Sequence, residues 1–159
     1  MTRSGLSMVK WHPHKISLPK NQQEWEEEFL EYQKFPEYYL LNKHKGMDVE
    51  GFKKIYFIEW AHRIVARSIG LIFVGPMSYF WFRGYLQPRM KRSLIGLLAF
   101  GGLQGAVGWW MVKSGLYEKT KELDKTPTVS PYRLTFHGYN AYIIYGILFW
   151  LSLHLLRRP

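Results

Sequence analysis

The distribution of apolar and polar residues divides the chain into a polar N-terminal part and three long apolar segments. Residues 1–54 are rich in charged and polar side chains, and apolar runs follow at 55–82, 94–112 and 134–156. A helix needs about 20 predominantly apolar residues to cross the hydrocarbon core of a bilayer. We therefore expect an all-α integral membrane protein, in which a three-helix bundle (55–156) follows an extramembrane arm (1–54).

The second and third runs satisfy this requirement without qualification. Leu94–Val112 contains no charged side chain, and Leu134–Leu156 contains none apart from its histidines, His137 and His154.

The first run is less uniform. Its first turns carry Glu59, His62, Arg63 and Arg67, and an uncharged stretch follows from Ser68 to Phe82. That stretch covers roughly 22 Å of a core about 30 Å thick. The charged turns must therefore lie near one membrane surface or inside the bundle.

The arm contains the pattern of a short amphipathic helix. Asn21 and Glu24 form a capping-box pattern, and Pro36 marks the expected end. The apolar positions of this helix are Trp25, Phe29 and Tyr32. This face could rest on the membrane or on a partner. It could equally belong to a soluble surface, because the opposite face is acidic and gains nothing from anionic lipid.

The charge of the chain points to lipid as a partner and not to nucleic acid. The net charge is +10, but the basic residues flank the apolar runs instead of forming a stripe with interleaved aromatic residues. The chain has no cysteine, which excludes disulfides and thiolate metal sites.

Basic residues also predict the orientation. The connection after the first run has no acidic residue, whereas the connection 113–133 mixes lysines with acids. The basic residues of the first connection and the tail are Arg83, Arg89, Lys91, Arg92, Arg157 and Arg158. By the positive-inside rule, the first connection and the tail face the cytosol or matrix, and the arm faces the opposite side.

Two histidines in separate runs are the main indication of function. His62 and His137 each lie about 20 residues from the basic inner end of their helix, so both are roughly 30 Å from the inner surface. Ionisable groups inside membrane segments are costly and mark functional sites by default. Such a pair, with Glu59 one turn from His62, suits a haem iron held between helices with a proton carrier beside it. The alternative is that each histidine is interfacial and bonded to a loop.

Neighbouring residues have two interpretations each. Arg63 and Arg67 lie on one helix face and could bind haem propionates or extend to lipid phosphates. A glycine face on the second run serves helix packing, or leaves room for a flat macrocycle; it consists of Gly101, Gly105 and Gly108. Trp81, Trp109, Trp110 and Trp150 suit interfacial anchoring. His12 and His14 suit a solvated loop, and His154 is given no role.

Four segments resemble the amino-terminal half of mitochondrial-type haem A synthase. They are Ser4–Met8 with Trp11, Glu59–Arg63, Gly102–Leu116 and Val129–Leu134 with His137. The resemblance implies an enzyme of the mitochondrial inner membrane that oxidises the methyl group of haem O to the formyl group of haem A. Its fold would be half of an eight-helix structure, with the N-terminus in the intermembrane space and the C-terminus in the matrix.

The resemblance also implies roles for individual residues. His62 and His137 would be the axial ligands of a haem b or haem O iron, and Glu59 would be the acidic residue essential to the chemistry. Ala66 stands where the family usually has glycine, which narrows the space beside a macrocycle.

The chain departs from the family pattern at both ends. In the family a membrane helix precedes the segment at Ser4, and a second half with its own histidine pair follows. The expectation is a half-molecule, for which two interpretations remain. It could be a haem-binding part of an enzyme, completed by a partner chain that supplies the missing helices, and contribute to haem A formation or to cytochrome c oxidase biogenesis. Alternatively, it could be a derived, non-catalytic accessory subunit of a mitochondrial respiratory assembly, with its haem site filled or empty.

Overall fold

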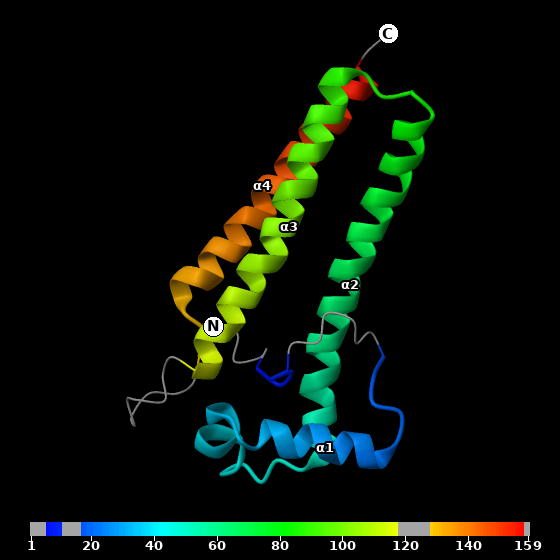
Figure 1. The fold of residues 1–159 in the computed structure, drawn as a ribbon. Helices are drawn as coiled ribbons and strands as arrows, with labels where there is room; N and C mark the ends of the chain where they lie inside the picture. The colour runs from blue at the N-terminus through cyan, green and yellow to red at the C-terminus, as the bar shows by residue number, and fades with distance from the viewer. Residues whose placement is uncertain (1–5, 11–16, 118–127, 158–159) are drawn as a thin grey trace. The chain divides into compact units, whose positions relative to one another are not determined.

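The computed structural model describes residues 6–10, 17–117 and 128–157, and all regular secondary structure in them is helical. The elements are α1 (Gln22–Tyr32), a π-helical turn η1 (Tyr38–Asn42), α2 (Val49–Phe82), α3 (Pro88–Tyr117) and α4 (Pro131–Leu156) (Figure 1). Of these, α2, α3 and α4 are long and apolar enough to cross a membrane. The predicted all-α membrane fold is confirmed.

Each long helix extends beyond the apolar run that predicted it. α2 begins at Val49, before residue 55, while α3 begins at Pro88 and α4 at Pro131. An apolar run marks only the part of a helix that crosses hydrocarbon, whereas backbone hydrogen bonding continues into the polar turns. Proline suits the first turn of a helix, because its fixed φ is already helical and its missing N–H needs no acceptor there.

The predicted start of α1 is confirmed. The Asn21 side chain accepts the backbone N–H of Glu24 at 2.8 Å. The other half of the capping box differs, because the Glu24 carboxylate accepts the backbone N–H of Lys20 at 3.0 Å and not that of Asn21. α1 ends at Tyr32, before the proline at position 36, and η1 follows after a short turn.

The chain divides into two compact units. The first consists of Met1–Ser68 and Val112–Val129, and the second of Ile69–Met111 and Ser130–Pro159. The first turns of α2 and the last turns of α3 therefore belong with the arm.

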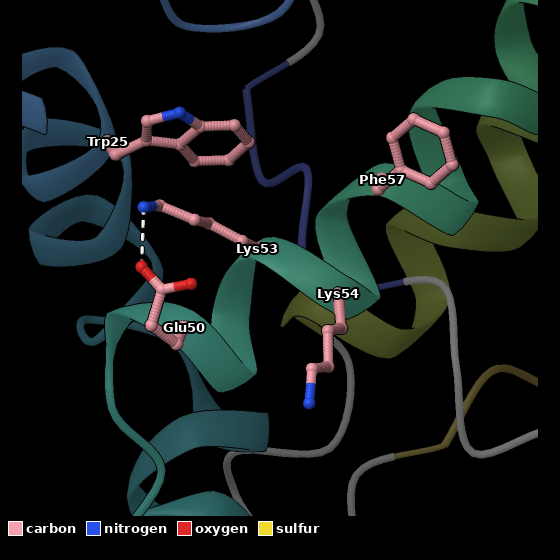
Figure 2. A pocket seen from close by; sticks show the side chains of 5 residues that line it. All are labelled: Trp25, Glu50, Lys53, Lys54 and Phe57. Carbon is pink, nitrogen blue, oxygen red and sulfur yellow. Dashed lines mark hydrogen bonds and ion pairs between the residues drawn. The ribbon is translucent and has the colours of Figure 1, made fainter. Parts of the chain in front are cut away.

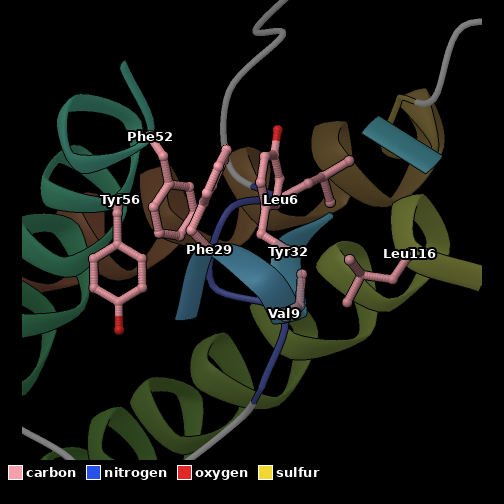
Figure 3. Packing of buried hydrophobic residues seen from close by; sticks show 7 residues of the cluster. All are labelled: Leu6, Val9, Phe29, Tyr32, Phe52, Tyr56 and Leu116. Carbon is pink, nitrogen blue, oxygen red and sulfur yellow. The ribbon is translucent and has the colours of Figure 1, made fainter. Parts of the chain in front are cut away.

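An aromatic core holds the first unit together. Tyr32 and Phe52 stack with ring centroids 5.1 Å apart, and Phe29 lies 5.3 Å from Phe52. Trp25 contacts Tyr56 edge-on at 5.2 Å. Figure 3 shows the buried cluster: Leu6, Val9, Phe29, Tyr32, Phe52, Tyr56 and Leu116. The apolar face of α1 is thus buried against the first turns of α2, which answers the question that the sequence left open.

Replacing Phe52 with alanine should loosen the arm. Phe52 is fully buried, and Phe→Ala substitutions in a core cost about 3–5 kcal/mol. We expect backbone amides of α1 to exchange with deuterium much faster, as measured by mass spectrometry. Phe57→Ala is the matched control, because Phe57 lies on the same helix but is 52% exposed. Equal acceleration in both variants would contradict the assigned core.

In the second unit, α3 and α4 lie side by side (Figure 1), joined by polar and small residues. Leu97 and Val107 are its buried apolar side chains on α3. Many large apolar side chains point outward instead; Leu71, Ile72 and Tyr142 are each at least 72% exposed. Lipid as the surrounding solvent accounts for such a surface.

Candidate functional site

Glu59 lies on α2, 8% exposed, and its carboxylate binds the N-terminal segment. Oε2 accepts the backbone N–H of Ser7 at 3.1 Å, the Ser7 hydroxyl at 2.8 Å and the backbone N–H of Met8 at 2.9 Å. One carboxylate oxygen thus receives the donors of two consecutive residues that are distant in sequence. Glu59 fixes these residues against α2.

Arg63 completes this contact from the next turn of α2. Its Nη2 lies 2.6 Å from Glu59 Oε1 and also donates to the Met8 carbonyl at 3.3 Å. Both charged side chains are largely buried, so the ion pair is shielded from water. We call Ser7, Met8, Glu59 and Arg63 the carboxylate clasp.

The residue before the clasp packs on the end of α3. A Cβ atom at Gly115 would lie 2.8 Å from Leu6 Cδ2, closer than carbon atoms pack. Glycine at this position therefore lets Leu6 enter the core of the first unit.

His137 projects from α4 onto the glycine face of α3. A Cβ atom at Gly108 would lie 2.9 Å from His137 Cε1, so the imidazole occupies the space that a larger residue would fill. The Gln104 side chain donates to the His137 carbonyl at 3.1 Å and accepts from the Asn140 amide at 2.8 Å. Asn140 is buried. These contacts fix the rotation of α4 against α3 at His137.

The other predicted site residues lie on α2. His62 is exposed, and Arg67 is half-buried one turn after Arg63. His62 belongs to the first compact unit and His137 to the second, so their predicted apposition stays a prediction. The structure brings Glu59 and Arg63 together. Arg63 already has two protein acceptors, and propionate binding by Arg63 and Arg67 also stays a prediction.

Sequence reasoning missed several residues of this region. Ser7 gave no local signal, because its partner Glu59 lies far along the chain. Gln104 and Asn140 did give one: amides inside uncharged membrane helices need partners. Arg133 was missed as a contact of Trp110; its guanidinium lies 4.3 Å from the ring centroid and donates to the Trp110 carbonyl at 3.1 Å.

His154, His12 and His14 are the other histidines considered in the sequence. His154 stacks on Trp150 with centroids 6.1 Å apart. His12 and His14 lie outside the described residues, as do Ser4 and Trp11 of the resembling segment. Within the described ranges, no cluster of three or more His, Cys, Asp or Glu residues could hold a bare metal ion.

A shallow pocket on the arm contains none of the predicted site residues. It is lined by Trp25, Glu50, Lys53, Lys54 and Phe57 (Figure 2). Lys53 pairs with Glu50 at 2.6 Å and lies 5.8 Å from the Trp25 ring centroid. Its ammonium group is therefore engaged within the protein.

Comparison with known proteins identifies relatives along nearly the whole chain. The family model of the cytochrome oxidase assembly protein COX15-CtaA matches residues 1–159. The haem A synthase of Allorhizobium ampelinum is 48% identical over 159 residues, covering 99% of this chain and 41% of the relative. The haem A synthase of Sinorhizobium fredii is 47% identical, covering 95% and 39%.

The similarity extends to a eukaryotic protein. The haem A synthase COX15 of Saccharomyces cerevisiae is 46% identical over 160 residues, covering 99% of this chain and 32% of the relative. The chain thus spans about two fifths or less of the length of these relatives. No solved structure matches. With a family model that matches every residue and relatives at this level of identity, the chain belongs to the haem A synthase family.

Proposed function

We propose that the chain binds haem between His62 and His137 and takes part in the oxidation of haem O to haem A. The observation that carries this proposal is the position of His137. Its imidazole packs on Gly108, and its backbone carbonyl accepts a hydrogen bond from the Gln104 side chain. Imidazole is a common axial ligand of haem iron, and facing helices of a bundle are a common place for it.

The residues present fit a haem in their chemistry. His62 and His137 offer nitrogen ligands from two helices, and the glycines of α3 leave open space, since a Cβ at Gly101 or Gly105 would meet no atom within 4 Å. Arg67 adds positive charge to the turn after Arg63, as propionates require. When bound, the haem supplies the redox chemistry; the residues of this chain bind and orient it.

Glu59 is the proposed proton carrier of the site. In this proposal one of its carboxylate oxygens takes up or releases a proton, and the Ser7 hydroxyl, 2.8 Å from Oε2, is its hydrogen-bonding partner. Arg63 holds the carboxylate in place through Oε1 at 2.6 Å.

We further infer a location in the mitochondrial inner membrane, with the arm in the intermembrane space and the C-terminus in the matrix. The basic residues around the connection between α2 and α3 support this orientation. Lipid would contact the exposed apolar faces, and other membrane subunits, in a respiratory assembly, would contact the rest.

A non-catalytic accessory role is the second candidate. The carboxylate clasp favours it, because Glu59 and Arg63 are fully engaged in holding the N-terminal segment. This structural purpose accounts for the presence of Glu59 without any catalytic role.

Replacing Glu59 with glutamine should separate the two candidates. Glutamine keeps the shape of the side chain but removes the titrating group. If Glu59 carries protons, we expect the variant to retain haem but form no haem A, measured by extraction of haems from the native membrane with its partners present. Ser7→Ala is the control, because it removes one donor to Glu59 and leaves the carboxylate. Wild-type haem A formation by Glu59→Gln, or none by the wild-type chain, would favour the accessory role.

A further inference from the structure

Glu37, in the turn between α1 and η1, is a second buried acid of the first unit, and it differs from Glu59 in its surroundings. It is only 6% exposed. Its Oε2 is buried and has no hydrogen-bond partner, whereas both oxygens of Glu59 have donors. A buried carboxylate with one oxygen left without a donor is disfavoured, and such a group takes up a proton more readily.

The groups that face Glu37 come from α1, η1, α2 and the segment after η1, all in the first unit. The Tyr32 hydroxyl, on α1, hydrogen-bonds to Glu37 and accepts the amide of Asn42, at the end of η1, at 2.7 Å. Glu59, on α2, acts on Glu37 by charge repulsion, and Lys45, after η1, acts by attraction. Tyr32 and Asn42 are themselves buried. None of these four groups is a buried cation, because Lys45 is exposed.

We propose that Glu37 is a proton-binding site of the arm and that proton binding there is coupled to the negative charge of Glu59. Protonated Glu37 holds the turn before η1 against the aromatic core. In the protonated state the turn stays buried beside Tyr32. Ionisation places a second negative charge near Glu59 and draws the turn toward water. This inference concerns the first unit alone and does not depend on haem.

The direction of the pH effect follows from the surroundings. Burial, followed by repulsion from Glu59, raises the pKa of Glu37 from 4.5 to about 7. Between these values the folded arm binds more protons than the unfolded arm. The stability contributed by protonated Glu37 is therefore fully present below pH 4.5 and is lost as pH rises through about 7.

Infrared spectroscopy of the purified full chain tests the proton site directly. We expect the carbonyl band of a protonated, buried carboxyl group to titrate near pH 7 and to be absent in Glu37→Gln. Glu27→Gln is the matched control, because Glu27 lies exposed on α1. A band near neutral pH that persists in Glu37→Gln, or a wild-type chain without one, would overturn the proposal.

Two further variants test the coupling with opposite signs. Glu59→Gln removes the repulsion and should move the midpoint to lower pH, while Lys45→Gln removes the attraction and should move it to higher pH. Because Glu59→Gln also weakens the clasp, deuterium exchange of α1 must first show a folded arm. If the arm of Glu59→Gln is not folded, the Lys45→Gln variant alone decides the test. An unchanged midpoint in Lys45→Gln and in folded Glu59→Gln would refute the coupling.

Deuterium exchange at two pH values tests whether protonated Glu37 holds the turn before η1 against the aromatic core. At pH 8 we expect α1 of Glu37→Gln to exchange about tenfold to 100-fold more slowly than the wild type, after correction for intrinsic rates. At pH 5 the two proteins should exchange alike. The same difference at both pH values would mean that the substitution acts through packing and not through a proton.

Discussion

Glu59→Ala is expected to release residues 6–9 from α2 and to lower the free energy of unfolding of the first unit by about 3–5 kcal/mol, the usual cost of removing one partner of a buried ion pair. The substitution leaves the Arg63 guanidinium without its carboxylate and the N–H groups of Ser7 and Met8 without an acceptor. Denaturant unfolding in detergent, followed by deuterium exchange of the arm, measures the loss.

The chain supplies a matched control on the same helix. Glu50 and Lys53 also form an ion pair at 2.6 Å, but the Glu50 side chain is 70% exposed. Exposed pairs contribute about 0–1 kcal/mol, so Glu50→Ala should change the stability little. Similar losses for the two variants would show that burial of the clasp does not govern its strength.

Gly108→Ala is expected to weaken haem binding by about tenfold to 100-fold, the equivalent of about 1–3 kcal/mol of overpacking. The new methyl group would lie 2.9 Å from His137 Cε1 and must push the imidazole away from α3. Haem content per chain and the optical spectrum of the purified variant measure the effect.

Gly96→Ala is the control for this experiment, because Gly96 lies on the same helix but outside the glycine face. A Cβ at Gly96 meets no atom within 4 Å, and alanine favours a helix by about 1 kcal/mol over glycine. This variant should bind haem like the wild type and be slightly more stable. If Gly108→Ala also binds haem normally, the contact of the His137 imidazole with α3 is not needed for haem binding.

The fold could be predicted where it depends on local pattern. Three long apolar runs sufficed for α2, α3 and α4, and the side chain of Asn21 identified the start of α1. The spacing of Glu59 and Arg63, four residues apart, was compatible with their ion pair.

Contacts between distant parts of the chain could not be predicted in this way. Periodicity carries no information on which surface covers the apolar face of α1, and Phe52 lies at the start of a membrane helix. For the same reason the attachment of Ser7 to Glu59 was invisible, although both residues belonged to segments that resembled the family. The π-helical turn η1 is too short to produce a periodic signal.

The sequence predicted which residues form the candidate site, and the structure adds the contacts that fix their positions. The resemblance assigned His137 a ligand role, but only the contacts with Gly108 and Gln104 show how α3 sets its position. Polar amides inside uncharged membrane helices were the available signal for Gln104 and Asn140.

Electron paramagnetic resonance of the oxidised, haem-loaded chain tests the central claim most directly. With His62 and His137 as the two axial ligands, the wild-type chain should give a low-spin signal from one haem, because two imidazoles complete the coordination of iron. His62→Ala and His137→Ala should each lose that signal, whereas His154→Ala, which removes the histidine beside Trp150, should keep it. A wild-type low-spin signal in either of the first two variants would contradict the account.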